Sequence, residues 1–303
     1  MLGFEKGSRE DIQNYCHSVM NDLPSLSKTT KYQTANLLVS NTSKGDLDVD
    51  FKHNVAEYYG THVESLPFDN PQTVARYINN WAKENTNSII DKVIDPGYIR
   101  PEWPCLLSNA LYFYGYWTYP FDKSHTFDSR FKLENGETVS VKMMKRNDFS
   151  DALFSFGKSS CYSRLSLPYG NGAFCMDIYL PEDGYGVIDV ADCLADDANR
   201  QKEQSSYVSL FDLQIPKFNI KGYAELTGPI NKLSNYALGS VAIYQAISLT
   251  NDEKGTETAS VTQSGFVSSP RSIKFIADHP FVFTIRSNGI VLFVGVYNGD
   301  KQQ

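Results

Sequence analysis

The sequence has few of the features that define several large protein classes. Its five cysteines are widely scattered and have no CxxC spacing: Cys16, Cys105, Cys161, Cys175 and Cys193. This distribution argues against a disulfide scaffold and against a zinc site. Since unpaired cysteine behaves as a small hydrophobe, we expect most of these residues to be buried free thiols.

Long basic and long apolar runs are also missing. The 28 basic residues are outnumbered by 35 acidic ones, which gives a net charge of -7 and argues against a nucleic-acid partner. Apolar runs such as residues 289–294 are far shorter than the roughly 20 residues that span a bilayer, so no membrane span is predicted. Residues 1–7 have neither a basic nor an apolar signal region, so the visible start predicts no signal peptide.

Catalytic motifs are absent as well. The sequence has no GxSxG, HExxH or GxGxxG pattern and no Gly-rich phosphate loop. Because Asp278 and His279 are adjacent and lead into Pro280, we do not expect them to hydrogen-bond as a catalytic pair. The conceivable metal ligands fit no standard spacing: His53, His62 and either Asp50 or Glu64. We therefore expect neither an enzyme nor a metal or other cofactor.

A hydrophobic content of 41% in 303 residues is enough for a sizeable core. Neither an internal repeat nor a linker rich in Pro, Gly or Ser divides the chain, so we expect one domain over residues 1–303. Asn70 and Pro71 are typical first residues of a helix, which we expect to end near Lys83. Another helix is predicted over residues 9–20, with one buried stripe formed by Ile12, Tyr15, Cys16 and Val19.

After Asp95 the pattern changes to short apolar or alternating runs separated by turn residues. The predicted strands are residues 106–113, 139–143, 165–168, 174–181, 209–216, 241–250, 281–286 and 290–297. Helices come first and strands follow, which predicts an α+β domain with mixed or antiparallel sheets. The irregular stretch from Thr262 to Ser272 has the length and composition of an exposed functional loop.

Several motifs occur in an order that resembles one family. Residues 251–262, Asn-Asp-Glu-Lys-Gly-Thr-Glu-Thr-Ala-Ser-Val-Thr, are similar to the hinge of a serpin reactive loop, and Asp278-His279-Pro280-Phe281 follows as in that family. Further serpin-like segments are Asn79-Asn80-Trp81 with Thr86 and Ile89, residues 108–117, residues 120–122, Thr126, Phe127, Phe131, Val141, Met143-Met144, residues 213–218 and Phe293-Val294-Gly295. The resemblance implies the serpin fold with an exposed reactive-centre loop at about residues 255–274.

The chain departs from the family pattern in three places. It begins at what resembles the end of the family's third helix, so we expect an N-terminally truncated serpin domain without the helix that members bury beneath the main sheet. Residues 223–240 are shorter than the corresponding family segment. Gln245 replaces a histidine of many members, and its amide could also donate a hydrogen bond to Asn109.

The hinge residues suit insertion as a strand. Side chains alternate between the two faces of a strand, and the face to be buried must carry small, uncharged groups. That face would present Thr256, Thr258, Ser260 and Thr262, and the solvent face would present Glu257, Ala259, Val261 and Gln263. Gly255 permits the turn before them, and Asp252 and Glu253 mark the end of the preceding strand. In the family, Asn109, Trp117 and Gln245 correspond to positions where the sheet opens.

The reactive bond is expected within residues 263–272. Counting from Gly255 as in the family places it between Ser269 and Pro270, although most serine proteases do not cleave before proline. The alternatives, in order of preference, are the small residues Val267, Ser268 and Ser269, then Arg271-Ser272 for a trypsin-like pocket, then Phe266-Val267 for a chymotrypsin-like pocket.

The resemblance implies a suicide-substrate inhibitor whose cut loop inserts into a sheet, a well-known case of strand addition and of strain released by proteolysis. Its partner would be a serine protease, or alternatively a cysteine protease, held in a covalent complex by a monomeric inhibitor. The family implies an extracellular or cell-envelope location. A non-inhibitory binding or carrier protein is the rival hypothesis, and catalysis comes third.

Overall fold

The computed structural model describes residues 8–26, 30–147, 152–233, 241–254 and 271–299. Backbone packing divides the described chain into two compact units. The first contains the described parts of Met1–Leu26, Lys31–Tyr114 and Asn219–Thr250; the second contains those of Ser27–Thr30, Gly115–Phe218 and Asn251–Gln303. Within these residues, the structure contains no helix with the length and apolarity needed to cross a membrane.

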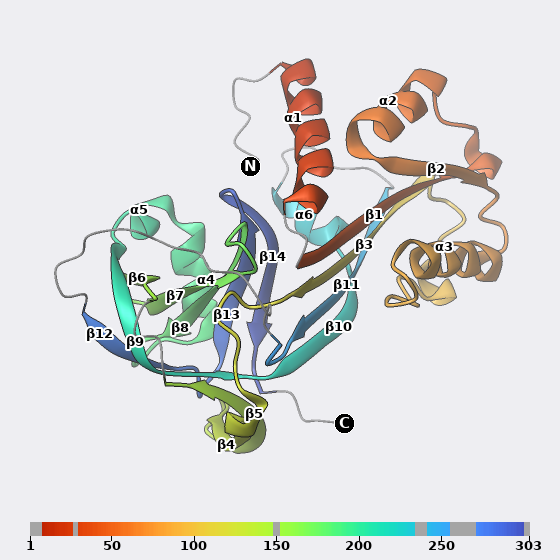
Figure 1. Cartoon of the computed structure of the whole chain (residues 1–303). Coiled ribbons are helices and arrows are strands. Elements are labelled where there is room, and N and C mark those ends of the chain that lie inside the picture. Colours follow the sequence, from red (N-terminus) through yellow and green to blue (C-terminus); the bar gives the residue numbers. More distant parts are fainter. Residues whose placement is uncertain (1–7, 27–29, 148–151, 234–240, 255–270, 300–303) are drawn as a thin grey trace. The chain divides into compact units, whose positions relative to one another are not determined.

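The first unit is built on a five-stranded sheet with the order β10-β11-β3-β1-β2 (Figure 1). Its strands are β1 (Thr30–Asn41), β2 (Thr61–Leu66), β3 (Cys105–Gly115), β10 (Phe218–Glu225) and β11 (Ala242–Asn251). Its helices are α1 (Arg9–Asp22), α2 (Val49–Tyr59), α3 (Pro71–Asn85) and α6 (Thr227–Leu233), with 3-10 turns at Leu23–Ser25, Thr42–Lys44 and Pro96–Tyr98.

Helix α3 covers one face of this sheet, which we call the outer face. The Asn70 side chain caps the helix by accepting from the Thr73 amide at 3.1 Å, and Pro71 occupies its first turn. Val74 and Ile78 are fully buried against the sheet. The helix predicted from residue 70 is therefore confirmed, ending at Asn85 rather than near Lys83.

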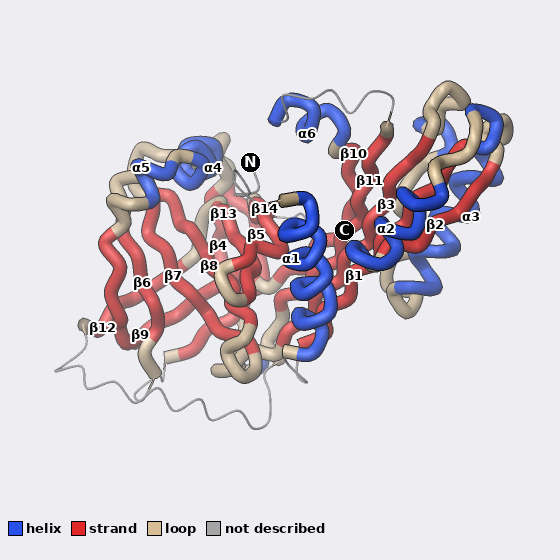
Figure 2. The backbone as a smooth tube through the Cα atoms, turned by 90° about the horizontal axis from the view of Figure 1, so that it is seen from above, coloured by secondary structure: helices blue, strands red, loops and turns tan. Residues whose placement is uncertain are grey.

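Helix α1 lies on the opposite, inner face of the same sheet (Figure 2). The predicted helix is confirmed over Arg9–Asp22, but the predicted buried stripe is wrong, because no described residue of α1 is fully buried. Tyr15 is 47% exposed, and Cys16 and Val19 are half-buried. These side chains line a largely apolar cavity of about 370 Å³ between α1 and the inner face.

The second unit contains a nine-stranded sheet with the order β14-β13-β8-β7-β6-β9-β5-β4, and β12 pairs with β9. Its strands are β4 (Phe127–Lys132), β5 (Thr138–Arg146), β6 (Phe154–Lys158), β7 (Tyr162–Tyr169), β8 (Phe174–Pro181), β9 (Gln204–Pro216), β12 (Ser272–Ile276), β13 (Phe281–Ser287) and β14 (Ile290–Tyr297). Its helices are α4 (Val187–Ala195) and α5 (Asp197–Arg200), with a 3-10 turn at Lys123–His125.

All eight strands predicted from the sequence are present, and two of them, β8 and β14, have the predicted bounds. The predicted order of helices first and strands afterwards is wrong in detail. Strands β1 and β2 lie between α1, α2 and α3 in the sequence. Both strands belong to the five-stranded sheet. The α+β class holds, since one unit combines helices with a mixed sheet and the other is mainly antiparallel.

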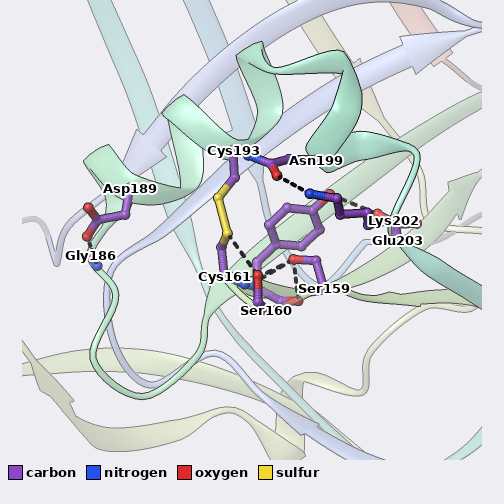
Figure 3. Close-up of a disulfide and its surroundings, with 10 residues drawn as sticks. Ser159, Ser160, Cys161, Gly186, Asp189, Cys193, Asn199, Lys202 and Glu203 are labelled. Carbon is purple, nitrogen blue, oxygen red and sulfur yellow. Dashed lines mark hydrogen bonds between the residues drawn. A yellow bond between two sulfur atoms is a disulfide. The ribbon is translucent and has the colours of Figure 1, made fainter.

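One disulfide corrects the prediction for the cysteines (Figure 3). Cys161, before β7, is bonded to Cys193 in α4, across a sequence separation of 32 residues. Of the free cysteines, Cys105 is buried, whereas Cys16 and Cys175 are half-buried. The prediction of mostly buried free thiols is therefore wrong. Two cysteines on separate elements leave no local spacing signal, because the fold alone brings them together.

The disulfide fastens α4 to the sheet beneath it. Val187 and Val190 of α4 pack with Tyr162 and Val282, which belong to β7 and β13. This apolar cluster and the disulfide hold the same elements together. The covalent link also restricts the unfolded chain, and this effect stabilises the folded state.

We expect the double variant Cys161→Ser/Cys193→Ser to lower the free energy of unfolding by about 2–4 kcal/mol, since the bond closes a loop of medium length. Urea unfolding monitored by circular dichroism measures this loss, and dithiothreitol should reproduce it in the unchanged protein. Cys175→Ser is the matched control and should leave the response to dithiothreitol unaltered. Detection of five free thiols in the unreduced protein would contradict the pairing.

Candidate functional site

The centre of the first unit's sheet is the pairing of β3 with β11, which we call the seam. The two strands run parallel, and their register extends from Ala242 opposite Leu106 to Thr250 opposite Tyr114. Parallel pairing is slightly less stable per residue than antiparallel pairing. A strand made from the chain that follows β11 would run antiparallel to both neighbours if it lay between them.

On the inner face, the Asn109 side chain connects the seam to β1. Its amide nitrogen donates to Asn36 Oδ1 at 2.8 Å and to Thr34 Oγ1 at 3.1 Å. Its carbonyl oxygen accepts from Gln245 Nε2 at 2.9 Å. The amide of Gln245 thus donates to Asn109, and Asn109 links β1, β3 and β11 through side-chain hydrogen bonds.

On the outer face, the neighbouring position of the seam places Ala246 opposite Ala110. Both alanines are buried in the core beneath α3, together with Tyr244 of β11 and Ile78 of the helix. Alanine pairs bury little surface directly across a sheet. Packing on this face therefore depends on α3, which covers both sides of the seam.

The chain that follows α3 is bonded back to the helix. Asn79 Oδ1 accepts from the backbone amides of Val93 and Ile94 at 2.7 and 3.1 Å. Thr86 Oγ1 donates to the Ala82 carbonyl at 2.7 Å and accepts from the Ile90 amide at 3.1 Å. These contacts make α3 and residues 86–94 one covering layer over the outer face.

In the second unit, residues 251–254 are anchored immediately before the hinge sequence. Trp117 Nε1 donates to the Asp252 carbonyl at 3.0 Å, and the indole stacks on Tyr169 with ring centroids 4.2 Å apart. The side-chain amide of Asn251 donates to the Pro216 carbonyl at 2.9 Å. The Trp117 backbone amide donates to the Lys254 carbonyl at 3.3 Å, so the chain is held on both sides of Glu253.

Glu253 is 5% exposed, and its carboxylate accepts hydrogen bonds from Lys217 Nζ at 2.7 Å and from Thr126 Oγ1 at 2.9 Å. Burial acts to raise the pKa of this carboxyl group. The hydrogen bonds from Lys217 and Thr126 outweigh burial and leave the pKa below its usual value. Glu253 is therefore a buried carboxylate whose charge is matched by a half-exposed ammonium group.

The predicted site residues thus lie in separate units: Asn109 bonds Gln245 in the first, and Trp117 and Glu253 both hold residues 251–254 in the second. Arg271 and Ser272 are exposed, and the Arg271 carbonyl accepts from the Ser209 amide at 3.1 Å where β12 begins. The remaining predicted residues lie outside the described part of the chain: Gly255, Thr256, Glu257, Thr258, Ala259, Ser260, Val261, Thr262, Phe266, Val267, Ser268, Ser269 and Pro270.

The sequence interpretation assigned no role to Lys217, Thr126 or Tyr169, which hold Glu253 and Trp117 in place. Lys217 and Thr126 belong to recognised motifs, and a buried acidic residue requires a cationic or hydroxyl partner. This requirement could have predicted Lys217 and Thr126 as partners of Glu253. Tyr169 had no such signal, because stacking on Trp117 depends on the path of the backbone.

The prediction that Asp278 and His279 do not hydrogen-bond to each other is wrong. His279 Nδ1 lies 2.9 Å from Asp278 Oδ1, so these adjacent residues do form a hydrogen bond. The other ring nitrogen, Nε2, lies 3.2 Å from the Pro181 carbonyl oxygen. Both ring nitrogens therefore face oxygen atoms that fix the orientation of the imidazole. Nowhere in the described residues do three His, Cys, Asp or Glu side chains form a group suited to a metal ion.

A family model described as Serpin (serine protease inhibitor) matches residues 1–299. Antichymotrypsin-2 of Bombyx mori is 29% identical over 280 residues, which cover 84% of this chain and 73% of the relative. Serpin-Z1 of Arabidopsis thaliana is 33% identical over 246 residues, which cover 74% of this chain and 61% of the relative. The chain therefore matches less than two thirds of the length of serpin-Z1.

Solved structures show the same fold. Serpin48 of the insect Tenebrio molitor superposes with a TM-score of 0.77 at 25% identity, covering 97% of this chain and 82% of that one. The native stressed conformation of AtSerpin1 of Arabidopsis gives a TM-score of 0.79 at 23% identity, covering 96% and 82%. The fold class predicted from the sequence is confirmed.

For the seam, we expect Gln245→Leu to lower the free energy of unfolding by about 1–3 kcal/mol, because Asn109 Oδ1 loses its donor while partly buried. Gln245→His is the control, since its ring N–H can still donate and should reduce the loss. A double-mutant cycle with Asn109→Ala, measured by urea unfolding, gives the coupling between the two side chains. Strict additivity would show that the hydrogen bond contributes nothing.

For Glu253, a pKa lowered in the folded state means that its charge stabilises the fold above the usual glutamate value of about 4.3. This contribution is lost as the pH falls through that value toward the folded-state pKa. We expect the melting temperature of the unchanged protein to exceed that of Glu253→Gln at about pH 7, and the gap to narrow below about pH 4.3. The exposed Glu137→Gln is the control. A gap independent of pH would contradict the assignment.

Proposed function

This chain belongs to the serpin family, and we propose that it inhibits a serine protease, or alternatively a cysteine protease, as a suicide substrate. The protease nucleophile would attack a carbonyl carbon within residues 263–272, break that peptide bond and form an acyl-enzyme. The amine of the new amino terminus is the leaving group, and the C-terminal fragment stays in the second unit through β12, β13 and β14. The hinge at residues 255–262 then enters the seam as a strand and carries the acylated protease with it.

The seam is the observation that supports this proposal most strongly. At its centre it is joined by an amide pair, Asn109 with Gln245, and by an alanine pair, Ala110 with Ala246. Neither pair buries much apolar surface across the two strands. Opening at these two central pairs thus costs little direct side-chain packing, although the register also pairs Phe113 with Leu249 and Leu111 with Ile247. The inserted strand would replace one parallel ladder with two antiparallel ones.

The anchored residues 251–254 support the proposal in a second way. Trp117 and Glu253 hold the chain at a fixed point immediately before Gly255. Folding the hinge back at this point would start a strand whose buried face carries Thr256, Thr258 and Ser260. Small hydroxyl side chains can enter a closing sheet without burying a charge.

For the reactive bond, we propose the region Val267–Ser269 ahead of Arg271. The Arg271 carbonyl accepts a hydrogen bond from Ser209, and Ser272 already pairs in register with Ser209 of β9. A protease cleft must surround an extended peptide from both sides, so a bond held at the start of a sheet strand is a poor substrate. Phe266 remains the third candidate.

The disulfide supports a location outside the cytosol. Disulfide bonds form and persist in secreted and envelope proteins, whereas reducing systems keep cytosolic thiols free. Cys161 and Cys193 therefore favour an extracellular or cell-envelope inhibitor, which we expect to act as a monomer.

A panel of subtilisin-, elastase-, trypsin- and papain-like proteases tests the proposed function. We expect a detergent-resistant complex with at least one of them, and mass spectrometry of the C-terminal fragment, separated by denaturation, locates the reactive bond. A non-inhibitory binding protein would instead be cut without a complex and would show no rise in melting temperature. That result would overturn the proposal.

Two hinge variants test the insertion step. Thr258→Arg places a charge on the face to be buried, so we expect cleavage to continue while covalent complex is lost. Ala259→Arg adds the same side chain on the solvent face and should retain complex formation. Gel electrophoresis of reaction mixtures separates complex from cut inhibitor. Equal effects of the two variants would contradict the proposed alternation.

A further inference from the structure

We propose that Tyr207 and Phe211 of β9, together with Arg271 and Lys274, form a second contact surface for the target protease beside the bond that it would cut. We call these four side chains the flanking surface. The inference deepens the proposed function. It rests on the recognition of residues 263–272 by a protease, and it does not require insertion of a strand.

The two aromatic side chains are the most accessible rings of the described chain. Tyr207 is 56% exposed and Phe211 is 54% exposed, more than any other aromatic side chain of the described residues. Both belong to β9, and β12 runs parallel beside this strand (Figure 1). Apolar surface in contact with water is surface that a partner can bury with a gain in free energy.

The backbone of β9 explains why Phe211 faces the solvent. Before this residue the burial alternates, and Val208 and Leu210 are buried. Consecutive residues of β12 pair with Leu210 and with Asp212, so Phe211 is an extra residue in β9. After this bulge the alternation changes phase, and Leu213 is buried. Bulges often lie beside functional sites, where they redirect a side chain.

Both rings lie close to the point where the chain enters β12. Ser272 of β12 is opposite Ser209 of β9, so Tyr207 and Phe211 are each two residues away from this pair. Residues in a strand are about 3.3 Å apart along its axis, and neighbouring strands are about 5 Å apart. The backbone at each ring is therefore within about 10 Å of Ser272.

A protease that binds the reactive bond is too large to avoid this surface. The preferred region of the bond, residues 267–269, is two to four residues before Arg271, a span of at most about 14 Å. A folded domain of about 200 residues has a radius of gyration of about 16 Å. An enzyme that surrounds the bond therefore meets the start of β12 and the adjoining part of β9. This short span identifies the protease as the partner.

The charges beside the rings define the partner surface further. Arg271 and Lys274 are exposed, and neither forms an ion pair within the described residues. Asp212, which is opposite Lys274, already accepts from Gln214 and lies 3.6 Å from Lys145. A protease rim with apolar surface and a carboxylate would complement this arrangement. Aromatic and arginine side chains contribute much of the binding energy in protein interfaces.

Rapid-quench cleavage of the full chain tests the aromatic contact. The enzyme is the member of the protease panel that cuts residues 263–272 fastest, and the chain is in excess. A contact away from the reacting atoms acts equally on the bound substrate and on the transition state. We therefore expect Tyr207→Ala and Phe211→Ala each to raise the half-saturating concentration about five- to tenfold and to leave the limiting rate unchanged. An unchanged half-saturating concentration in both variants would overturn the proposal.

Control variants distinguish a lost contact from a damaged fold. Tyr185→Ala removes an exposed tyrosine between β8 and α4, and it should leave the half-saturating concentration unchanged. Tyr207→Phe keeps the ring and should restore most of the affinity lost in Tyr207→Ala. Since both rings are exposed, the alanine variants should keep the melting temperature of the unchanged protein. An equal loss of affinity in Tyr185→Ala would contradict a local contact.

The charged part of the flanking surface has its own measurement. The same protease, with its catalytic nucleophile replaced by alanine, binds the full chain without cutting it. We expect Lys274→Gln to weaken this binding at about 50 mM salt, and the difference to shrink at about 1 M salt, where charges are screened within about 3 Å. Lys44→Gln, an exposed lysine of the first unit, is the control. Equal binding of Lys274→Gln and the unchanged protein would overturn the carboxylate in the proposed rim.

The outcomes separate the flanking surface from the proposed function. If a protease cuts the loop without forming a complex, the proposed function fails, and the half-saturating concentrations still decide the flanking surface. If no enzyme of the panel cuts residues 263–272, both proposals fail. Sedimentation tests the remaining alternative, a second copy of this chain. Self-association that Tyr207→Ala abolishes would assign the surface to that copy and overturn the inference.

Discussion

The hydrogen bond between the Asn109 and Gln245 side chains is the contact around which the rest of the first unit is organised. It crosses the seam, and the other end of the Asn109 side chain reaches β1. A side-chain hydrogen bond of this kind is strong while water is kept away from it. Its donor and acceptor can also exchange one another for water or for a new strand. Apolar pairs across the same strands, such as Phe113 with Leu249, offer no such exchange. The seam is therefore closed by one exchangeable polar contact together with apolar pairs.

The second unit imposes a complementary constraint. Residues 251–254 are held by Trp117, by the Pro216 carbonyl and by the ion pair of Glu253 with Lys217. An insertion that starts next to a fixed point loses less chain entropy than one that starts from a free end. The buried carboxylate also needs its cation, because an unpaired charge there would cost several kcal/mol. In the proposed mechanism, stability and the direction of insertion would thus depend on the same few side chains.

Much of this arrangement could be predicted from the sequence, and the failures have identifiable causes. Helix α3 was recognisable because Asn70 and Pro71 specify a helix start, and β8 and β14 were recognisable from apolar runs bounded by turn residues. The buried stripe of α1 failed because periodicity indicates which side chains share a face and not how fully that face is covered. The Cys161–Cys193 bond and the stacking of Tyr169 on Trp117 join segments distant in sequence, so only the fold reveals them. The hinge alternation lies outside the described residues and stays a prediction.

If the seam opens as proposed, its alanine pair leaves the resistance to opening on the outer face mainly to the covering layer. Ala110 and Ala246 face each other beneath α3, and side chains this small allow the helix to pack across both strands at once. Separating the strands must disturb that packing before any inserted strand can compensate for it. Since Asn79 and Thr86 bond residues 86–94 to α3, a perturbation at those residues acts on the whole layer. In the proposed mechanism, the barrier to opening would therefore lie on the outer face, while the polar pair on the inner face links the strands of the closed sheet.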